Sequence, residues 1–198
     1  MEEKKFQEAL REFAEQELAI KSRAAKVHAD VNQTYGNEEE LPYSYHLDRV
    51  AEAVKKFGYS IIWEKDDVLP VLFGAYFHDS IEDARLTYHD VMKIASVFMT
   101  KEQAYHATEI VYALTNEKGR NRHERANDKY YDGIRYIPYA PLVKACDRYA
   151  NYSYAKETAS RMEKCYRDEM KEFLEKLTPA TLDVRFSIPQ ELKDALSA

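Results

Sequence analysis

Residues 77–83 read Phe77-His78-Asp79-Ser80-Ile81-Glu82-Asp83 and directly follow an apolar run. The stretch places one histidine and three carboxylates within less than two turns of a helix. His78 and Glu82 are four residues apart, as are Asp79 and Asp83, so each pair would share one helix face. So much acid at the end of a buried segment is costly unless a cation compensates it. The stretch therefore predicts a divalent metal site and, with it, a metal-dependent hydrolase.

The composition favours helices. The chain has 198 residues, of which 45% are hydrophobic, so it can furnish the core of one domain spanning 1–198. Only 5 glycines and 6 prolines are present, too few for the turns of a sheet protein of this length. The glycines are scattered and form no Gly-rich phosphate-binding loop. We therefore expect an all-α fold.

Charge and cysteine content narrow the classes of partner. The net charge of -6 disfavours a general nucleic-acid binder, which is usually basic. Two cysteines without a CxxC spacing predict reduced thiols and a cytoplasmic protein. The N-terminus lacks the apolar core of a signal peptide, and the longest apolar run is too short to span a bilayer. We expect no membrane partner, whereas a homo-oligomer stays open.

Apolar periodicity and capping signals place the helices. Thr87 with Asp90, and Thr100 with Gln103, have the spacing of capping boxes that start helices. A weak alternation at 184–188 is the one hint of a strand. The expected helices cover 3–33, 44–57 with Gly58 as terminator, 66–79, 87–99, 100–114, 123–132, 141–155 and 158–176, with a short one after Pro189.

Further ligands for the metal can be sought on neighbouring helices. His46 lies one helix before His78, and Asp147 lies on the expected helix 141–155. Two histidines and two aspartates with water suit Mn, Fe, Mg or Zn, and the mixed nitrogen and oxygen set favours Mn or Fe. A second His-Asp dipeptide, 89–90, falls in the first turn of a helix. There the carboxylate serves as a cap, so we do not count it as a ligand.

The helix around Asp147 carries a polar face. Lys144, Asp147, Arg148 and Asn151 follow i, i+3, i+4, i+7 spacing, which gives that face two cations, one acid and one amide. This pattern indicates a metal ligand beside phosphate-binding groups. A solvated helix face with ordinary charge pairs would show the same pattern.

Taken together, these motifs resemble the HD-domain metal phosphohydrolases. Within that group the chain is most similar to the hydrolase domain of Rel/Spo-type enzymes, which degrade guanosine alarmones such as ppGpp. The likeness covers roughly residues 28–154, leaving 155–198 as a C-terminal helical extension, and implies an all-α HD-domain bundle. It rests on the ordered set Gln33, Pro42-Tyr43, Tyr45-His46, His78-Asp79-x-x-Glu82-Asp83 and Lys144-x-x-Asp147-Arg148-x-x-Asn151.

The resemblance implies roles for these residues. His46, His78, Asp79 and Asp147 would bind a divalent metal, typically Mn²⁺. Glu82 and Asp83 would orient and deprotonate the attacking water, so they are the catalytic candidates. Asn151 would contact the ribose or base of a nucleotide, and Lys144 and Arg148 its phosphates, unless Arg148 instead braces Asp147.

Two further groups are candidates for substrate binding. Arg122 and Arg125 belong to the richest basic cluster of the chain, which would clamp phosphates or form an ordinary solvated loop. The Rel/Spo-type enzymes carry a basic pair before the Pro-Tyr motif, whereas here residues 33–40 contain no Lys or Arg and three Glu. Tyr35 could stack on a base instead. His28, His106 and His123 are expected to be structural or surface histidines.

The expected function is a stand-alone guanosine-3′,5′-bis(diphosphate) 3′-pyrophosphohydrolase. An HD phosphohydrolase acting on another nucleotide or small phosphoester is the alternative that the altered turn at 33–40 favours. A non-catalytic HD module that senses a nucleotide is a third reading. All six ligand and water-activating positions are filled in this sequence, which speaks against it.

Overall fold

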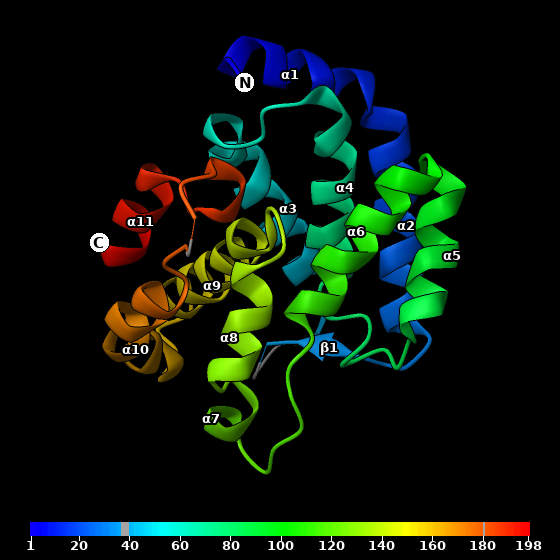
Figure 1. The fold of residues 1–198 in the computed structure, drawn as a ribbon. Coiled ribbons are helices and arrows are strands. Elements are labelled where there is room, and N and C mark those ends of the chain that lie inside the picture. The colour runs from blue at the N-terminus through cyan, green and yellow to red at the C-terminus, as the bar shows by residue number, and fades with distance from the viewer. Residues whose placement is uncertain (37–39, 180) are drawn as a thin grey trace.

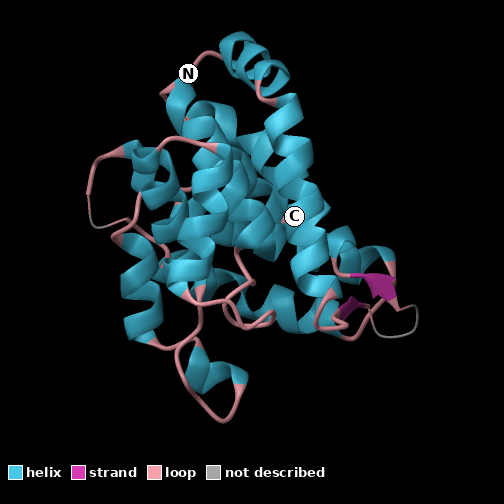
Figure 2. Cartoon of the chain, turned by 90° about the vertical axis from the view of Figure 1, so that its right-hand side faces the viewer, coloured by secondary structure: helices cyan, strands magenta, loops and turns pink. Residues whose placement is uncertain are grey.

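A computed structural model describes residues 1–36, 40–179 and 181–198, without the side chains of Arg122 and His123. It confirms the all-α prediction: helices enclose the core, and the described strands form one short hairpin (Figures 1 and 2). The elements are α1 Glu3–Glu12, α2 Ala14–Ala29, β1 Thr34–Tyr35, β2 Leu41–Pro42, α3 Ser44–Phe57, η1 Gly58–Ser60, α4 Lys65–Phe77, α5 Tyr88–Phe98, α6 Lys101–Leu114, α7 Arg122–Arg125, α8 Asp128–Arg135, α9 Ala140–Glu157, α10 Met162–Lys176, η2 Val184–Phe186 and α11 Gln190–Ser197.

Helix α4 runs through the centre of the molecule, with α2, α3 and α6 packed around it (Figure 1). Every residue from 68 to 77 is buried. Gly74 allows α6 to approach closely, because a Cβ there would lie 2.6 Å from Cγ2 of Ile110. Pro70 has no N–H to donate to the carbonyl of Asp66, and the side chain of Gln103 donates to that oxygen instead, at 2.9 Å. The helix therefore tolerates a proline in its interior.

The N-terminal segment forms two helices where the sequence predicts one. The chain bends at Phe13 (φ −90°, ψ 7°), between α1 and α2. The bend lets the apolar face of α1, with Phe6 and Leu10, pack on η1 and the start of α4 while α2 packs along α3 and α4. Leu18, which the periodicity assigns to the apolar stripe, is 64% exposed.

The two predicted capping boxes are confirmed. Thr87 and Asp90 form a complete capping box on α5, and Thr100 and Gln103 form one on α6. The predicted helix 123–132 is instead two helices, because the side chain of Asn127 accepts from the N–H of Tyr130 and starts α8 anew. The alternation at 184–188 is a 3₁₀ turn, η2, and the described residues there form no strand.

The β1–β2 hairpin and the C-terminal helices flank α9. In the hairpin Thr34 pairs with Pro42 and Tyr35 with Leu41 in antiparallel register. The acidic turn noted at 38–40 lies mostly outside the described residues. Helices α10 and α11 pack against α9. In the part of the chain that is described, no helix combines the length and the apolar character needed to cross a membrane.

Candidate metal centre and its surroundings

The His-Asp pair lies just beyond the C-terminus of α4. The helix ends at Phe77, so residues 78–83 are consecutive turns and the predicted sharing of helix faces does not hold. The N–H of Asp83 still donates to the carbonyl of Asp79, at 2.8 Å, which keeps these two residues one turn apart. Nδ1 of His78 lies 2.9 Å from the carbonyl oxygen of Ala75 and donates to it, so Nε2 is the ring atom that can bind a metal once it has lost its proton.

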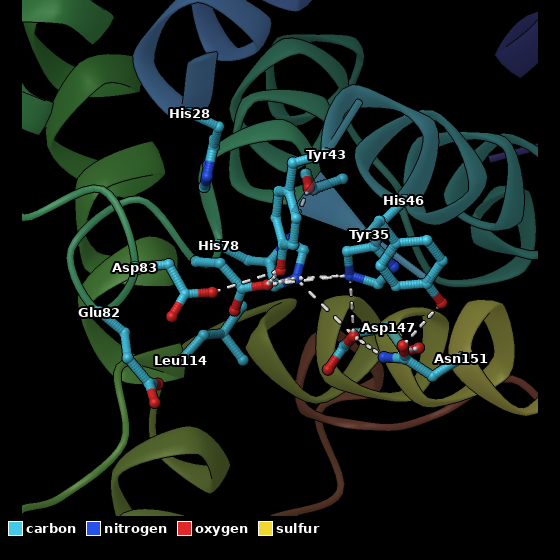
Figure 3. A network of polar contacts seen from close by, with 12 residues as sticks. His28, Tyr35, Tyr43, His46, His78, Glu82, Asp83, Leu114, Asp147 and Asn151 are labelled. Carbon is cyan, nitrogen blue, oxygen red and sulfur yellow. Dashed lines mark hydrogen bonds and ion pairs between the residues drawn. The ribbon is translucent and has the colours of Figure 1, made fainter. Parts of the chain in front are cut away.

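Side chains from α3, the turn after α4, and α9 converge on one point (Figure 3). Nε2 of His46 lies 3.3 Å from Nε2 of His78 and 3.3 Å from Oδ1 of Asp147. Nε2 of His78 lies 2.8 Å from Oδ2 of Asp79 and 3.7 Å from Oδ1 of Asp147. The structure thus brings together all four residues that the sequence nominates as ligands.

These separations fit a divalent metal. Metal–nitrogen and metal–oxygen bonds of about 2.0–2.2 Å place neighbouring ligand atoms about 3.0–3.4 Å apart. His46, His78 and Asp79 offer atoms that all lie within 4.8 Å of one another. Two imidazole nitrogens facing each other at 3.3 Å repel through their lone pairs unless a proton or a cation lies between them. The donor set suits a mixed nitrogen and oxygen site.

The surrounding charges favour ionised carboxylates at this point. Burial alone would raise the pKa of Asp147, but Lys144, 3.0 Å away, and the two histidines hold it well below its ordinary range. Burial also opposes the charge on His78, yet the carboxylates of Asp79 and Asp147 outweigh it and raise the pKa of its imidazole to about 9. Burial likewise opposes the charge on Asp79, but His78 outweighs it and lowers the pKa of that carboxyl group. Both aspartates are therefore anionic at neutral pH, as metal ligands must be.

Glu82 and Asp83 occupy the rim of the same site and are held by different partners. The amide of Asn116 donates to Oε2 of Glu82 at 2.7 Å, and Arg125 lies 3.1 Å from Oε1. Gln33 donates to Oδ2 of Asp83 at 2.6 Å. Burial, then the charge of Asp79, raises the pKa of both carboxyl groups. Both are thus better proton acceptors than exposed carboxylates.

Tyr35 and Asn151 close one side of the site. The hydroxyl of Tyr35 donates to Oδ1 of Asn151 at 3.0 Å, and the amide of Asn151 donates to Oδ1 of Asp147 at 2.6 Å. A pocket of about 300 Å³ is lined by Asn151 together with Asp79, Glu82 and Lys144. Tyr35 lines a separate cavity of about 110 Å³, which Asn151 also lines. The polar face of α9 thus reaches the pocket instead of solvent.

The two arginines of the basic loop and Arg148 have different surroundings. Arg125 pairs with Glu82, which lines the pocket, whereas the side chain of Arg122 lies outside the described part of the structure. Arg148 is 8% exposed and lines the pocket, but its guanidinium pairs with Glu169 of α10 at 2.9 Å and lies over the ring of Phe173.

Several residues that hold the site have no role predicted from the sequence. Tyr43 donates a short hydrogen bond to Asp79. Asn116 holds Glu82, and His28, expected to be structural, lies 2.5 Å from the side chain of Gln33. Gln33 and Tyr43 belong to the resembling pattern, which could have flagged them. Nothing in the local sequence around Asn116 marks it.

Comparison with solved structures identifies a protein of the same fold. That structure is described as a metazoan orthologue of SpoT that hydrolyses ppGpp and plays a role in starvation responses. The TM-score is 0.63 at 19% sequence identity, and the match covers 91% of this chain and 93% of that one. No protein-family model matches the sequence, and no curated protein matches it. The comparison shows a common fold over nearly the whole chain.

Proposed function

We propose that this protein is a metal-dependent phosphohydrolase of nucleotides, acting as a guanosine-3′,5′-bis(diphosphate) 3′-pyrophosphohydrolase. One observation carries the proposal: three metal-ligand candidates (His46, Asp79 and Asp147), the carboxylates Glu82 and Asp83, and Lys144 line a single pocket. Nε2 of the fourth candidate, His78, lies 2.8 Å from Oδ2 of Asp79. The fold shared with a protein described as hydrolysing ppGpp supports the choice of substrate. So does the Glu82-Asp83 pair that the sequence shares with Rel/Spo-type enzymes.

His46, His78, Asp79 and Asp147 would hold the metal. The mixed nitrogen and oxygen donors favour Mn²⁺, with Fe²⁺, Mg²⁺ and Zn²⁺ as the other choices. A divalent ion supplies Lewis-acid polarisation of a phosphoryl oxygen and makes water more acidic. Lys144 and the hydrogen bond from Asn151 keep Asp147 ionised and fixed in orientation.

Glu82 and Asp83 would accept the proton of the attacking water. The water oxygen bonds to the phosphorus attached to the ribose 3′ oxygen, the bond from that phosphorus to the ribose breaks on the opposite side, and pyrophosphate leaves. The proton taken by the carboxylate can then pass to the ribose oxygen. The raised pKa values of both carboxyl groups suit a residue that takes a proton and gives it back.

Residues that line the pocket or contact its lining would bind substrate. Asn151 and Tyr35 would meet the ribose and base, and Lys144 and Arg125 would offset phosphate charge. In this proposal Arg122 also binds the substrate phosphates. Arg148, on α9, would line the pocket. Fixed cations of this kind let a protein of net charge -6 bind an anionic nucleotide.

We extend the hydrolase domain over residues 1–198 and place it in the cytoplasm. Helices α10 and α11 of the C-terminal extension pack on α9, the helix that carries Asp147, so they support the site. Cys146 and Cys165 are both free thiols, in keeping with a reducing compartment.

The decisive experiment measures pyrophosphate and phosphate release by Mn²⁺-loaded protein on a panel of nucleotides that includes guanosine 3′-pyrophosphates. Asp147→Ala serves as the control without a complete ligand set. Pyrophosphate release from the 3′-pyrophosphates alone is the expected result. Silence on the entire panel, with metal bound, would instead support a nucleotide sensor.

A second candidate is an HD phosphohydrolase for another nucleotide or a small phosphoester. The observation that favours it is Tyr35, which covers His46 at the position where a basic pair would otherwise hold guanine. Phosphate release from nucleoside monophosphates, with none from 3′-pyrophosphates, would decide for this candidate.

A further inference from the structure

A chain of hydrogen bonds reaches Asp83 from a buried histidine on another helix. His28 lies in the last turn of α2 and is 1% exposed. Its Nδ1 is 2.5 Å from Oε1 of Gln33, and Nε2 of Gln33 donates to Oδ2 of Asp83 at 2.6 Å. Figure 3 shows His28 and Asp83 on the same side of the site. The chain thus links α2 to the turn that follows α4.

The chemistry of each group fixes the direction of this chain. An ionised carboxylate only accepts hydrogen bonds, so Gln33 must turn its NH₂ group towards Asp83. The carbonyl oxygen of Gln33 then faces His28, and it also only accepts. Nδ1 of His28 must therefore carry a hydrogen. The orientation of the Gln33 amide is thus coupled to both Asp83 and His28 through these two hydrogen bonds.

The surroundings of His28 favour the same tautomer. Burial lowers the pKa of His28, so its ring is neutral and has one N–H. Its Nε2 is buried and has no hydrogen-bond partner among the described residues. Leaving a lone pair there costs less than leaving an N–H without an acceptor. The ring also stacks on Tyr43, with centroids 4.6 Å apart and planes at 24°, which limits its rotation.

Both hydrogen bonds recorded for the Asp83 side chain, in the described residues, go to the same oxygen. Gln33 donates to Oδ2, and the hydroxyl of Tyr43 approaches Oδ2 at 3.4 Å. Oδ1 is left for a group that enters the pocket, which Asp83 lines. Glu82 differs, because Asn116 and Arg125 take one oxygen each.

We propose that His28 and Gln33 form a positioning dyad for Asp83, in which the Nδ1–H of His28 orients the Gln33 amide and the amide holds Oδ2 so that Oδ1 receives the proton of the attacking water. The inference rests on the proposed hydrolase function for the role of Asp83. It makes Asp83, more than Glu82, the proton acceptor, because Asp83 is oriented before substrate arrives and still has one oxygen without a hydrogen-bond donor among the described residues, whereas both oxygens of Glu82 have one.

The first test reads the tautomer directly and needs no turnover. Nitrogen-15 NMR of the full chain, loaded with diamagnetic Mg²⁺ or Zn²⁺, distinguishes Nδ1–H from Nε2–H, and His28→Asn assigns the signal. We expect the Nδ1–H form in the wild-type protein and its loss in Gln33→Met, which keeps the side-chain length but offers no amide. An Nε2–H ring in the wild-type protein would overturn the dyad.

The second test measures turnover of whichever nucleotide the protein hydrolyses. Gln33→Met should lower kcat by about 10- to 100-fold, as loss of a supporting hydrogen bond does, with KM and metal content unchanged. Gln7→Met, at an exposed position, is the matched control. Wild-type kcat in Gln33→Met would overturn the proposal.

A pair of substitutions at His28 separates positioning from folding. The amide nitrogen of asparagine can stand where Nδ1 of histidine stands and donate to Gln33, whereas leucine cannot. His28→Asn should therefore recover most of the turnover that His28→Leu loses, with unfolding temperatures measured alongside. Equal kcat values in the two variants at equal stability would contradict a positioning role.

These tests keep two failures apart. If the wild-type protein hydrolyses nothing on the nucleotide panel, the proposed function fails, and the tautomer experiment still decides whether the dyad exists. A crystal structure of Gln33→Met then completes the test. A rotated Asp83 carboxylate supports positioning by the dyad, and an unmoved one overturns it.

Discussion

The phenol ring of Tyr35 lies stacked on the imidazole of His46, with ring centroids 4.9 Å apart and planes at 20°. Tyr35 comes from the β1–β2 hairpin and His46 from the first turn of α3. Through its hydroxyl, Tyr35 also contacts Asn151 on α9, which in turn holds Asp147. One aromatic side chain therefore joins two of the elements that carry the proposed metal ligands.

The proposed function predicts that Tyr35 contributes to substrate binding through its ring. Tyr35→Ala removes the ring and should raise KM about tenfold, whereas Tyr35→Phe keeps the ring and should change KM much less. Steady-state kinetics on the nucleotide substrate gives both values. An unchanged KM in Tyr35→Ala would place the base elsewhere.

The four ligand candidates predict strong stabilisation by metal. At a free concentration of 100 times Kd, Mn²⁺ should raise the free energy of unfolding by about 2.7 kcal/mol, because it binds the folded chain alone. Asp147→Asn should lose most of this gain, and Asp168→Asn, an exposed carboxylate on α10, should keep it. Thermal unfolding with and without Mn²⁺ measures the difference. A full metal-dependent shift in Asp147→Asn would remove that residue from the ligand set.

The raised pKa of His78 predicts that metal binding releases a proton. In protein stripped of metal by a chelator, His78 keeps its proton up to a pH of about 9, and a metal must displace it. The apparent affinity should therefore rise about tenfold per pH unit between pH 7 and 9 and then level off. Titration calorimetry in buffers of different ionisation enthalpy counts the protons released. No proton release at pH 7 would show that the ring is already neutral.

The parts of the fold that the sequence predicts well are those set by neighbours along the chain. Both capping boxes start helices where expected, because Thr87 and Thr100 contact residues only three positions ahead. The starts of α4 and α9 also lie within one residue of the prediction, whereas α4 ends at Phe77, two residues earlier than predicted, and α9 at Glu157, two residues later. The bend at Phe13 does not, since it serves the packing of α1 on η1 and α4, which lie far away in sequence.

In the candidate site, too, some residues can be predicted from the sequence, whereas others depend on contacts that only the fold creates. Residue type and order suffice to nominate His46, His78, Asp79 and Asp147, and the structure brings these four together. Asn116 and His28 could not be predicted from the sequence. Their roles depend on contacts with residues far away in the chain or on another element, Asn116 with Glu82 and His28 with Gln33. The environment of Arg148 likewise depends on α10, which the helix pattern alone does not place.

Arg125 is expected to act on substrate phosphates. Arg125→Ala should raise KM for a polyphosphate nucleotide several-fold while metal content stays normal, because the guanidinium pairs with Glu82, which lines the pocket, and not with the ligands. Arg120→Ala, an exposed residue of the same loop, is the control. Kinetics and metal analysis are made on both variants, and an unchanged KM in Arg125→Ala argues against the clamp.

Substitution of Arg148 tests whether this residue contacts substrate or supports the packing of α9 on α10. Its guanidinium lies 4.5 Å from the ring centroid of Phe173 and 5.0 Å from that of Tyr166, so Arg148→Ala should lower the free energy of unfolding by about 2 kcal/mol. The pair with Glu169 adds little, since that carboxylate is 44% exposed. Arg167→Ala, at an exposed position of α10, should change stability by less than about 0.5 kcal/mol. Chemical denaturation and KM are measured together, and a raised KM at wild-type stability would make Arg148 a substrate ligand.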